Sequence, residues 1–327
     1  MTPTPRENLM LFGHGAAERV FADAAGSGRL HHAWLLTGPQ GVGKATLAWR
    51  MARLLLAGAE GNDLATPAVR RIVAGSHADV LTLEREVDAR TKKLRREVAV
   101  DQVREIAGFL HLTPAEGGWR VVVVDGAEDM NRNSANALLK ILEEPPKRAV
   151  LLLTSDAPGR LLPTIRSRCR RMRLDPLSEG EMDAALRYLV PEQDAAARHE
   201  LALVADGAPG RAVALSEEGA LVLAALARSV LGAERLGVAR MHEVADQATR
   251  GDTAFTTFMD LLRSGLGDAV RAVARGRRVN GAALARRPLA EWGEVWHALG
   301  RLQSETERFN LDKRSAVLAG LELLSGP

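Results

Sequence analysis

Short, almost uniformly apolar stretches alternate with amphipathic stretches through the first half of the chain. Residues 34–36 form the first apolar run, and after a glycine-rich turn apolar residues recur at helical spacing over 47–55. Further apolar runs cover 121–124 and 150–154. Strands that are apolar on both sides occur in parallel sheets that helices cover on both faces. The pattern therefore predicts an α/β first domain built on a parallel sheet.

Amphipathic patterns predict helices after these runs and throughout the second half. Residues 134–144 place several apolar side chains on one helical face, and two prolines then stop the pattern. From about residue 178 onward the strand signals fade, and alanine-rich helical segments follow. Trp292, Trp296 and Leu299 follow helical spacing, which is typical of a packing face in a core or a subunit interface.

Composition narrows the class of protein. The 327 residues are 46% hydrophobic, which is enough for two or three packed domains. The apolar runs fall far short of the roughly 20 residues that cross a bilayer. Residues 1–8 hold two prolines and a charge pair instead of a basic start and an apolar stretch, so no secretory signal is expected. We therefore expect a cytoplasmic protein without a membrane segment.

Cysteine content and charge exclude some functions and leave others open. The single cysteine, Cys169, excludes an internal disulfide and any zinc site built from several cysteines. The net charge of +3 is small against a charged fraction of 26%. Such a balance permits local basic patches but does not by itself indicate a nucleic-acid-binding protein.

Residues 38–44 read Gly-Pro-Gln-Gly-Val-Gly-Lys, a P-loop pattern between a predicted strand and a predicted helix. Gly38, Gly41 and Gly43 allow the backbone to wrap around phosphates, and the helix start offers N–H groups with a positive dipole end. Lys44 supplies a positive charge for the outer phosphates. An ordinary glycine turn is the alternative, but both flanking elements favour a phosphate-binding loop.

The positions that hold magnesium and activate water depart from the pattern of an active ATPase. Ala45 stands where a serine or threonine hydroxyl normally binds magnesium, and Thr46 lies one position later. Asp125 ends its apolar run as a Walker B aspartate does, but Gly126 stands where the catalytic glutamate is expected. The next carboxylates come too late to position the attacking water. We therefore expect ATP or ADP binding with weak magnesium binding and no hydrolysis in this chain's own site.

Two basic runs leave alternatives open. The run at 165–171 includes Arg168, and it fits either a solvated basic edge or an arginine finger that stabilises charge on a neighbour's phosphate. The run at 92–96, Lys-Lys-Leu-Arg-Arg, fits either a solvated loop or a nucleic-acid contact. The residue types alone do not choose between these interpretations.

Several motifs in a fixed order make the chain similar to a known family. They are Phe-Gly-His at 12–14, His-Ala-Trp-Leu-Leu-Thr-Gly-Pro at 32–39, Asn-Ala-Leu-Leu-Lys-Ile-Leu-Glu-Glu-Pro-Pro at 136–146 and Ser-Arg-Cys at 167–169. Together they resemble the clamp-loader branch of the AAA+ ATPases. Asn-Leu-Asp-Lys at 310–313 is also similar to the tail of that family's delta-prime branch. The resemblance extends over most of the chain.

This resemblance implies an architecture and a setting. It implies an α/β P-loop AAA+ domain with a parallel sheet over 1–175, a small helical lid over 176–218 and an all-α collar for oligomerisation over 219–327. The implied function is support of ATP-dependent loading of a sliding clamp onto primed DNA during replication, within the DNA polymerase III holoenzyme. The implied partners are gamma or tau and delta subunits, with the clamp and primed DNA reached through the complex and no membrane contact.

The resemblance also implies roles for single residues. Arg168 matches the trans arginine finger, Arg211 matches a sensor 2-like position, and Thr154 or Ser155 matches sensor 1. The departures at the magnesium and catalytic positions favour a delta-prime stator over the gamma or tau motors, which keep both groups. A motor of the gamma or tau type is the alternative, and a free-standing nucleic-acid-binding protein is another. Turnover by the isolated chain would support the first, and tight DNA binding without partners would support the second.

Zinc is the point where the chain departs from many members of this family. They often carry four zinc-binding cysteines after the P-loop helix, whereas residues 57–79 contain none. We therefore predict no zinc and no metal site built from protein side chains. His77 lies in this segment, where a lone histidine is more often a surface or capping residue than a metal ligand.

Overall fold

The apolar runs in the first half of the chain form strands of a single parallel sheet in the computed structural model. The structure describes residues 2–86, 95, 97–116, 118–216, 220–251, 253–274, 276 and 287–325. By its internal contacts the chain divides into two units, Met1–Val213 and Ala214–Pro327. The sheet belongs to the first unit.

Within the described residues the sheet has five strands in the order β2-β3-β4-β1-β5, and all neighbouring strands are parallel. The strands are β1 (Ala33–Thr37), β2 (Val80–Leu83), β3 (Arg120–Val124), β4 (Ala149–Ser155) and β5 (Arg170–Arg173). Because β4 lies between β1 and β3, the carboxyl ends of these three strands meet at one edge. Every residue of β3 and β4 is buried, as expected for strands that are covered on both faces.

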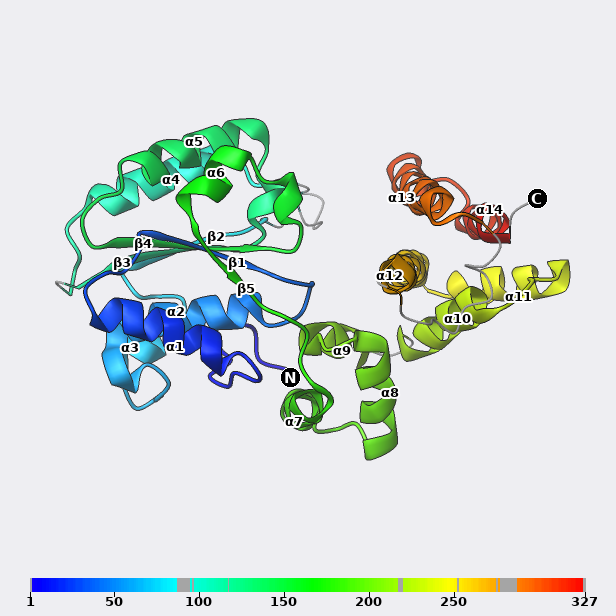
Figure 1. Cartoon of the computed structure of the whole chain (residues 1–327), viewed down its shortest axis with the longest axis horizontal. Helices are drawn as coiled ribbons and strands as arrows, with labels where there is room; N and C mark the ends of the chain where they lie inside the picture. Colours follow the sequence, from blue (N-terminus) through cyan, green and yellow to red (C-terminus); the bar gives the residue numbers. More distant parts are fainter. Residues whose placement is uncertain are drawn as a thin grey trace. The chain divides into compact units, whose positions relative to one another are not determined.

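Helices cover both faces of the sheet (Figure 1). One face carries α1 (Gly15–Gly26), α2 (Lys44–Ala57) and α3 (Pro67–Val73). The other carries α4 (Val100–His111), α5 (Arg132–Glu143) and α6 (Pro163–Arg168). Three short 3-10 turns lie between these elements, η1 (Gly58–Glu60), η2 (Ala127–Asp129) and η3 (Pro158–Arg160). Leu35, Leu138 and Leu153 share one apolar core, which joins β1 and β4 to α5.

Two arginines of α2 fix the path of the chain before α1. Arg53 is fully buried, and its Nη1 and Nη2 atoms donate to the carbonyl oxygens of Arg6 and Asn8, each at 3.0 Å. Arg50 donates to the carbonyl oxygen of Leu9 at 2.5 Å. Burial lowers the pKa of Arg53 to about 10. These bonds attach the beginning of the described chain to the helix that follows the P-loop.

Three helices follow β5, namely α7 (Glu179–Leu189), α8 (Ala195–Ala205) and α9 (Pro209–Ser216). Ser178 and Glu181 form a capping box at the start of α7, in which the glutamate carboxylate accepts from the backbone N–H and the hydroxyl of the serine. Helices α7 and α8 pack against each other, and α9 begins beside the P-loop.

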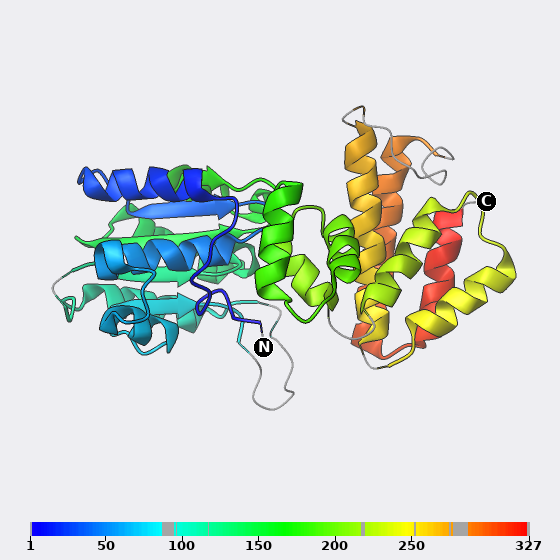
Figure 2. The same ribbon diagram turned by 90° about the horizontal axis from the view of Figure 1, so that it is seen from below.

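The described part of the second unit is helical (Figure 2). Its helices are α10 (Ala220–Gly232), α11 (Val238–Ala248), α12 (Ala254–Ala274), α13 (Leu289–Phe309) and α14 (Lys313–Ser325). Helix α12 packs against α10 and α13, and α14 packs against α11 and α13. Trp292 and Leu299 of α13 are fully buried, so the predicted packing face lies in the core here. None of the helices in the described ranges is long and apolar enough to span a bilayer.

The predicted α/β class, with a parallel sheet followed by helices, is confirmed. The sheet also contains β2 and β5, which the apolar pattern does not predict. In β5 three exposed arginines surround one buried residue, Met172, so its sequence reads as a basic run and not as a strand. This strand lies at an edge of the sheet, where long charged side chains can reach water.

The predicted division at 1–175, 176–218 and 219–327 stays a prediction, because the contacts separate two units and the boundary at 218 lies outside the described residues. The basic run at 92–96 also lies outside them, except for Arg95. The two interpretations of that run, a solvated loop and a nucleic-acid contact, therefore both stay open.

Candidate functional site

The P-loop joins the carboxyl end of β1 to the start of α2. Gly41 and Gly43 have φ of 77° and 110°, in the left-handed region that favours glycine. A Cβ atom on Gly41 would lie 2.5 Å from the backbone nitrogen of Arg211, and one on Gly38 would collide with the carbonyl oxygen of Leu174. The glycines therefore meet both a conformational and a spatial requirement of this loop.

Helix α2 begins at Lys44, so Ala45 and Thr46 lie in its first turn. Gly43 is the N-cap residue and supplies no side-chain hydrogen bond to the first backbone N–H groups. A helix start of this kind, behind a glycine-rich loop, binds phosphate through N–H groups and the positive end of the helix dipole. The loop therefore fits the phosphates of a nucleotide. The methyl side chain of Ala45 has no oxygen and cannot act as a magnesium ligand.

Lys44 is buried, with 6% of its side chain exposed, and its amino group is surrounded by acceptors. Its Nζ atom donates to the carbonyl oxygens of Gly38 at 3.1 Å and Pro39 at 2.6 Å. The same atom forms an ion pair with Oδ1 of Asp156, the residue that follows β4. A lysine ammonium has three N–H donors, so these three contacts engage all of them.

Asp125 and Thr154 meet at the ends of the adjacent strands β3 and β4. The Thr154 hydroxyl donates to Oδ1 of Asp125 at 2.5 Å and accepts from the backbone N–H of Gly126 at 3.0 Å. Ser155 is also buried, but its hydroxyl has no partner among the described residues. Because successive strand residues point to opposite faces, Thr154 contacts the aspartate and Ser155 does not. Their sensor roles stay predictions.

Gly126 follows Asp125 in a conformation that favours glycine. Its φ is 72°, and a Cβ atom there would lie 2.9 Å from Oδ2 of Asp129. The Asp129 carboxylate is paired with Nε of Arg85 at 3.0 Å. The backbone after β3 is therefore shaped around the absence of a side chain at the position where an active ATPase carries glutamate.

Glu128 is directed to the loop after β4. Its Oε1 atom accepts from the backbone N–H groups of Asp156 at 2.6 Å and Ala157 at 3.1 Å. Burial raises the pKa of Asp156, and Lys44 opposes this by favouring the charged carboxylate. The negative charges of Glu128 and Asp125 also raise the pKa of Asp156, so further carboxylates lie close to the ion pair of Lys44 and Asp156.

His14, in the Phe-Gly-His motif, contacts the P-loop directly. The buried ring donates from Nε2 to the carbonyl oxygen of Val42 at 2.8 Å, and it lies beside Gly43. The sequence pattern includes this histidine as part of a motif but does not predict the contact. The sequence pattern does not predict Asp156 as a site residue. Its position directly after a buried strand, next to the strand that leads into the P-loop, is nevertheless a sequence feature that could have indicated it.

Arg211 lies at the start of α9, against the tip of the P-loop. The backbone N–H of Gly210 donates to the carbonyl oxygen of Gly41 at 2.8 Å. The backbone of Arg211 therefore lies next to the phosphate-binding loop, where the resemblance to the clamp-loader family places a sensor 2-like residue. Its role in sensing nucleotide stays a prediction.

Arg168 is the last residue of α6 and is separate from the P-loop cluster. Its Nη2 atom pairs with Oε1 of Glu143 at 2.8 Å, and its Nη1 atom donates to the carbonyl oxygen of Thr164 at 3.1 Å. The side chain is 36% exposed. By contrast, Arg170 stacks on the buried ring of Trp34 at 4.6 Å from the ring centroid. The basic run thus contains arginines in different environments.

The remaining candidates occupy buried positions. Burial raises the pKa of Cys169 to about 12, so its thiol stays protonated. His77 is buried and not at the surface; its Nδ1 atom accepts from the backbone N–H of Asp79 at 3.1 Å, and burial lowers its pKa. In the described ranges no group of three or more histidine, cysteine, aspartate or glutamate side chains is placed to hold a metal ion. The predicted absence of zinc stays a prediction.

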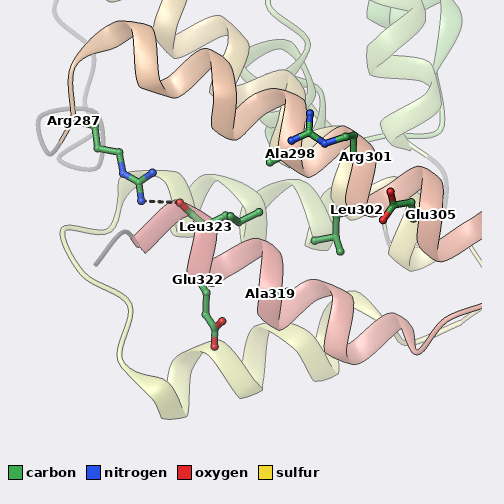
Figure 3. Close-up of a pocket in the computed structure, with 8 residues that line it drawn as sticks. All are labelled: Arg287, Ala298, Arg301, Leu302, Glu305, Ala319, Glu322 and Leu323. Atoms are coloured by element: carbon green, nitrogen blue, oxygen red, sulfur yellow. Dashed lines mark hydrogen bonds between the residues drawn. The ribbon is translucent and has the colours of Figure 1, made fainter.

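A groove in the second unit contains none of the predicted site residues (Figure 3). It lies between α13 and α14, with Arg287 at one end donating from Nη2 to the carbonyl oxygen of Leu323 at 3.0 Å. Its lining residues are Arg287, Ala298, Arg301, Leu302, Glu305, Ala319, Glu322 and Leu323. Both charged and apolar side chains form its walls.

The chain is similar in sequence to known subunits of DNA polymerase III. The chain is 39% identical over 209 residues to the DNA polymerase III subunit delta' of Pseudomonas aeruginosa, a match that covers 62% of this chain and 61% of that protein. It is 36% identical over 192 residues to the DNA polymerase III subunit delta' of Escherichia coli, covering 58% and 55% of the two chains. The Escherichia coli DNA polymerase III subunit tau is 32% identical over 210 residues, which cover 61% of this chain and 31% of tau.

The matched part thus spans about three fifths of the Pseudomonas aeruginosa delta' subunit. The family model described as "DNA polymerase III, delta subunit" matches residues 13–178, just over half of the chain. This range contains the P-loop, Asp125, Thr154 and Arg168. The chain therefore belongs to the DNA polymerase III delta-subunit family.

Proposed function

We propose that this chain is a delta-prime-type stator of the DNA polymerase III clamp loader, which serves a neighbouring subunit's ATP with Arg168 and does not hydrolyse ATP itself. The observation that carries the proposal is the contrast between a P-loop site that lacks its magnesium and catalytic side chains and a partly exposed arginine on α6. In this proposal the chain acts in the cytoplasm, in DNA replication.

The site at the P-loop supports nucleotide binding but not hydrolysis. Bound ATP or ADP would supply phosphates to the start of α2, with Gly38, Gly41, Gly43 and Lys44 as the binding groups. Ala45 offers no hydroxyl to magnesium, so metal binding is weak. Asp125 already accepts from Thr154, and the backbone at Gly126 favours glycine. No carboxylate in this arrangement takes the place of a water-positioning glutamate.

Arg168 supports the action on a neighbour. A guanidinium is permanently charged and planar, and it stabilises the charge of a transferring phosphoryl group when it is presented from an adjacent subunit. Glu143 and the Thr164 carbonyl hold this side chain from one side, and 36% of its surface faces outward. The partners in this proposal are gamma or tau and delta subunits, and through them the sliding clamp and primed DNA.

The test compares the isolated chain with the assembled complex. We expect the isolated chain to hydrolyse ATP at background, and to join gamma or tau and delta subunits from the same organism in a complex of defined mass. Omission of the chain should reduce ATPase activity and clamp loading. Failure to assemble contradicts the proposal, and robust turnover by the isolated chain that Lys44→Ala abolishes would favour a gamma or tau motor instead.

A further inference from the structure

The P-loop lysine already has an anionic partner within its own chain. Its three N–H donors reach the carbonyl oxygens of Gly38 and Pro39 and the carboxylate of Asp156. Since only 6% of the lysine side chain is exposed, water competes weakly for these donors. A phosphate that binds Lys44 must therefore displace at least one of the three acceptors, and the only charged one is Asp156.

The position of Asp156 is fixed by the chain around it. Glu128 accepts from the backbone N–H groups of Asp156 and Ala157, which ties the loop after β4 to the turn after β3. The second carboxylate oxygen of Glu128 is buried and has no partner among the described residues. The Asp156 side chain is 41% exposed, but the two connected turns hold its backbone in place and present its carboxylate to Lys44.

Charge makes this arrangement selective among nucleotides. Burial raises the pKa of Asp156, and the negative charges of Glu128 and Asp125 raise it further, whereas Lys44 pairs with its carboxylate. Like charges at short range in a partly buried site repel strongly. ATP carries one more phosphate and more negative charge than ADP, so the repulsion and the competition for Lys44 affect ATP more.

We propose that Asp156 is a specificity-determining residue of this P-loop, which competes with nucleotide phosphate for Lys44 and makes the site favour nucleoside diphosphate over nucleoside triphosphate. This inference rests on the nucleotide-binding part of the proposed function. It does not depend on Arg168 or on assembly with other subunits.

The size of the effect follows from the population of the ion pair. If the pair is closed in about nine tenths of the molecules, the apparent affinity of a ligand that needs the open form falls about tenfold. Asp156→Asn removes the charge but keeps the size of the side chain. We therefore expect this variant to bind ATP about tenfold more tightly, and ADP more tightly by a smaller factor.

The experiment measures binding of ADP and ATP to the full chain by calorimetric titration, for the wild type, Asp156→Asn and Asp101→Asn. Asp101 is an exposed aspartate on α4 that pairs with Arg104, so it controls for loss of one negative charge. Glu128→Gln is the second test variant, and it should shift the ATP to ADP ratio in the same direction by less. Adding Lys44→Met to the Asp156→Asn variant should abolish its gain in ATP affinity.

The wild type should bind ADP more tightly than ATP, and Asp156→Asn should narrow this difference. An unchanged ratio in both Asp156→Asn and Glu128→Gln, or an equal change in Asp101→Asn, overturns the proposal. So does the absence of binding of either nucleotide to the wild type and the variants when thermal unfolding shows that they are folded. Assembly with gamma or tau and delta subunits is measured separately, so failure here leaves the stator proposal to its own test.

Discussion

The P-loop and the end of α6 both carry a cation, but the two cations have different surroundings. Lys44 is 6% exposed and its donors end on acceptors of its own chain, whereas Arg168 is 36% exposed and is held from one side. A buried cation whose donors all end on its own chain must give up one of these contacts before it binds another molecule. An exposed guanidinium with fixed orientation is well placed to do so. The difference in exposure favours the proposal that Arg168 acts on a neighbouring subunit, whereas Lys44 stays within its own chain.

The largest effect that sharpens this comparison is expected from Arg168→Ala in the reconstituted complex. An arginine finger contributes on the order of 10³ in rate at the site it serves, but in the proposed complex the other active sites would have fingers of their own. We therefore expect a partial loss of ATPase activity and of clamp loading, with assembly retained. Steady-state ATP turnover of complexes of equal measured composition gives the result.

Arg170→Ala is the matched control for that change, because it removes the same charge from the same basic run. Arg170 stacks on Trp34 of β1 and lies in the edge strand β5. Its loss should affect stability more than the ATPase rate of the complex. Equal losses of activity from both variants would assign the whole run to a solvated basic edge.

A second change attempts to restore the missing catalytic side chain. Gly126→Glu places a side chain at φ 72° and against Asp129, so the free energy of unfolding should fall by about 1–3 kcal/mol. ATP turnover should remain at background. Urea denaturation and a turnover assay measure the two outcomes. Gly159→Glu is the control, since a Cβ atom there meets no atom within 4 Å; hydrolysis gained by the Gly126 variant alone would break the comparison.

A smaller effect is expected from Ala45→Ser, which returns a hydroxyl to the first turn of α2. We expect magnesium–nucleotide affinity to rise about threefold, the size of one net hydrogen bond or ligand contact. Hydrolysis should not appear while Gly126 remains. Nucleotide titrations are made with magnesium and with a chelator. If the affinity gain persists in chelator, the new hydroxyl does not act as a magnesium ligand.

The smallest effect is expected from His77, which lies away from Lys44 and Arg168, and it concerns the pH dependence of stability. Burial lowers the pKa of His77 in the folded chain, so below about pH 6.5 the unfolded state takes up a proton before the folded state does. The contribution of neutral, buried His77 to the free energy of unfolding is therefore complete at neutral pH and is lost as the pH falls through the pKa of the folded state. The wild type should therefore lose more free energy of unfolding than His77→Gln between about pH 7.5 and pH 5.5. Equal losses in urea titrations would show that His77 does not contribute.

Local patterns were sufficient to predict the P-loop and the three apolar strands beside it. Each is encoded within a few consecutive residues, such as Val121 to Val124, that are buried on both faces. The strand β5 was not predictable in the same way, because its arginines reach water at the sheet edge and leave only Met172 inside. A strand of this kind has the sequence of a charged loop.

The partners of the site residues were less predictable, because folding brings them together from distant parts of the sequence. Lys44 is paired with Asp156, and Arg168 with Glu143, and neither pair is marked by spacing. The alternative between Thr154 and Ser155 needed the strand register to show which hydroxyl contacts Asp125. Arg211 was placed near the P-loop only through the family resemblance.

Arg53 has a consequence for how the beginning of the chain can change during evolution. It binds the carbonyl oxygens of Arg6 and Asn8, and every amino acid carries such an oxygen. The two bonds from Arg53 therefore constrain the backbone of this segment and place no requirement of their own on the type of side chain at either position. Any conservation of Arg6 or Asn8 would have to come from their other contacts, such as those of Arg6 with Val73 and of Asn8 with Met10.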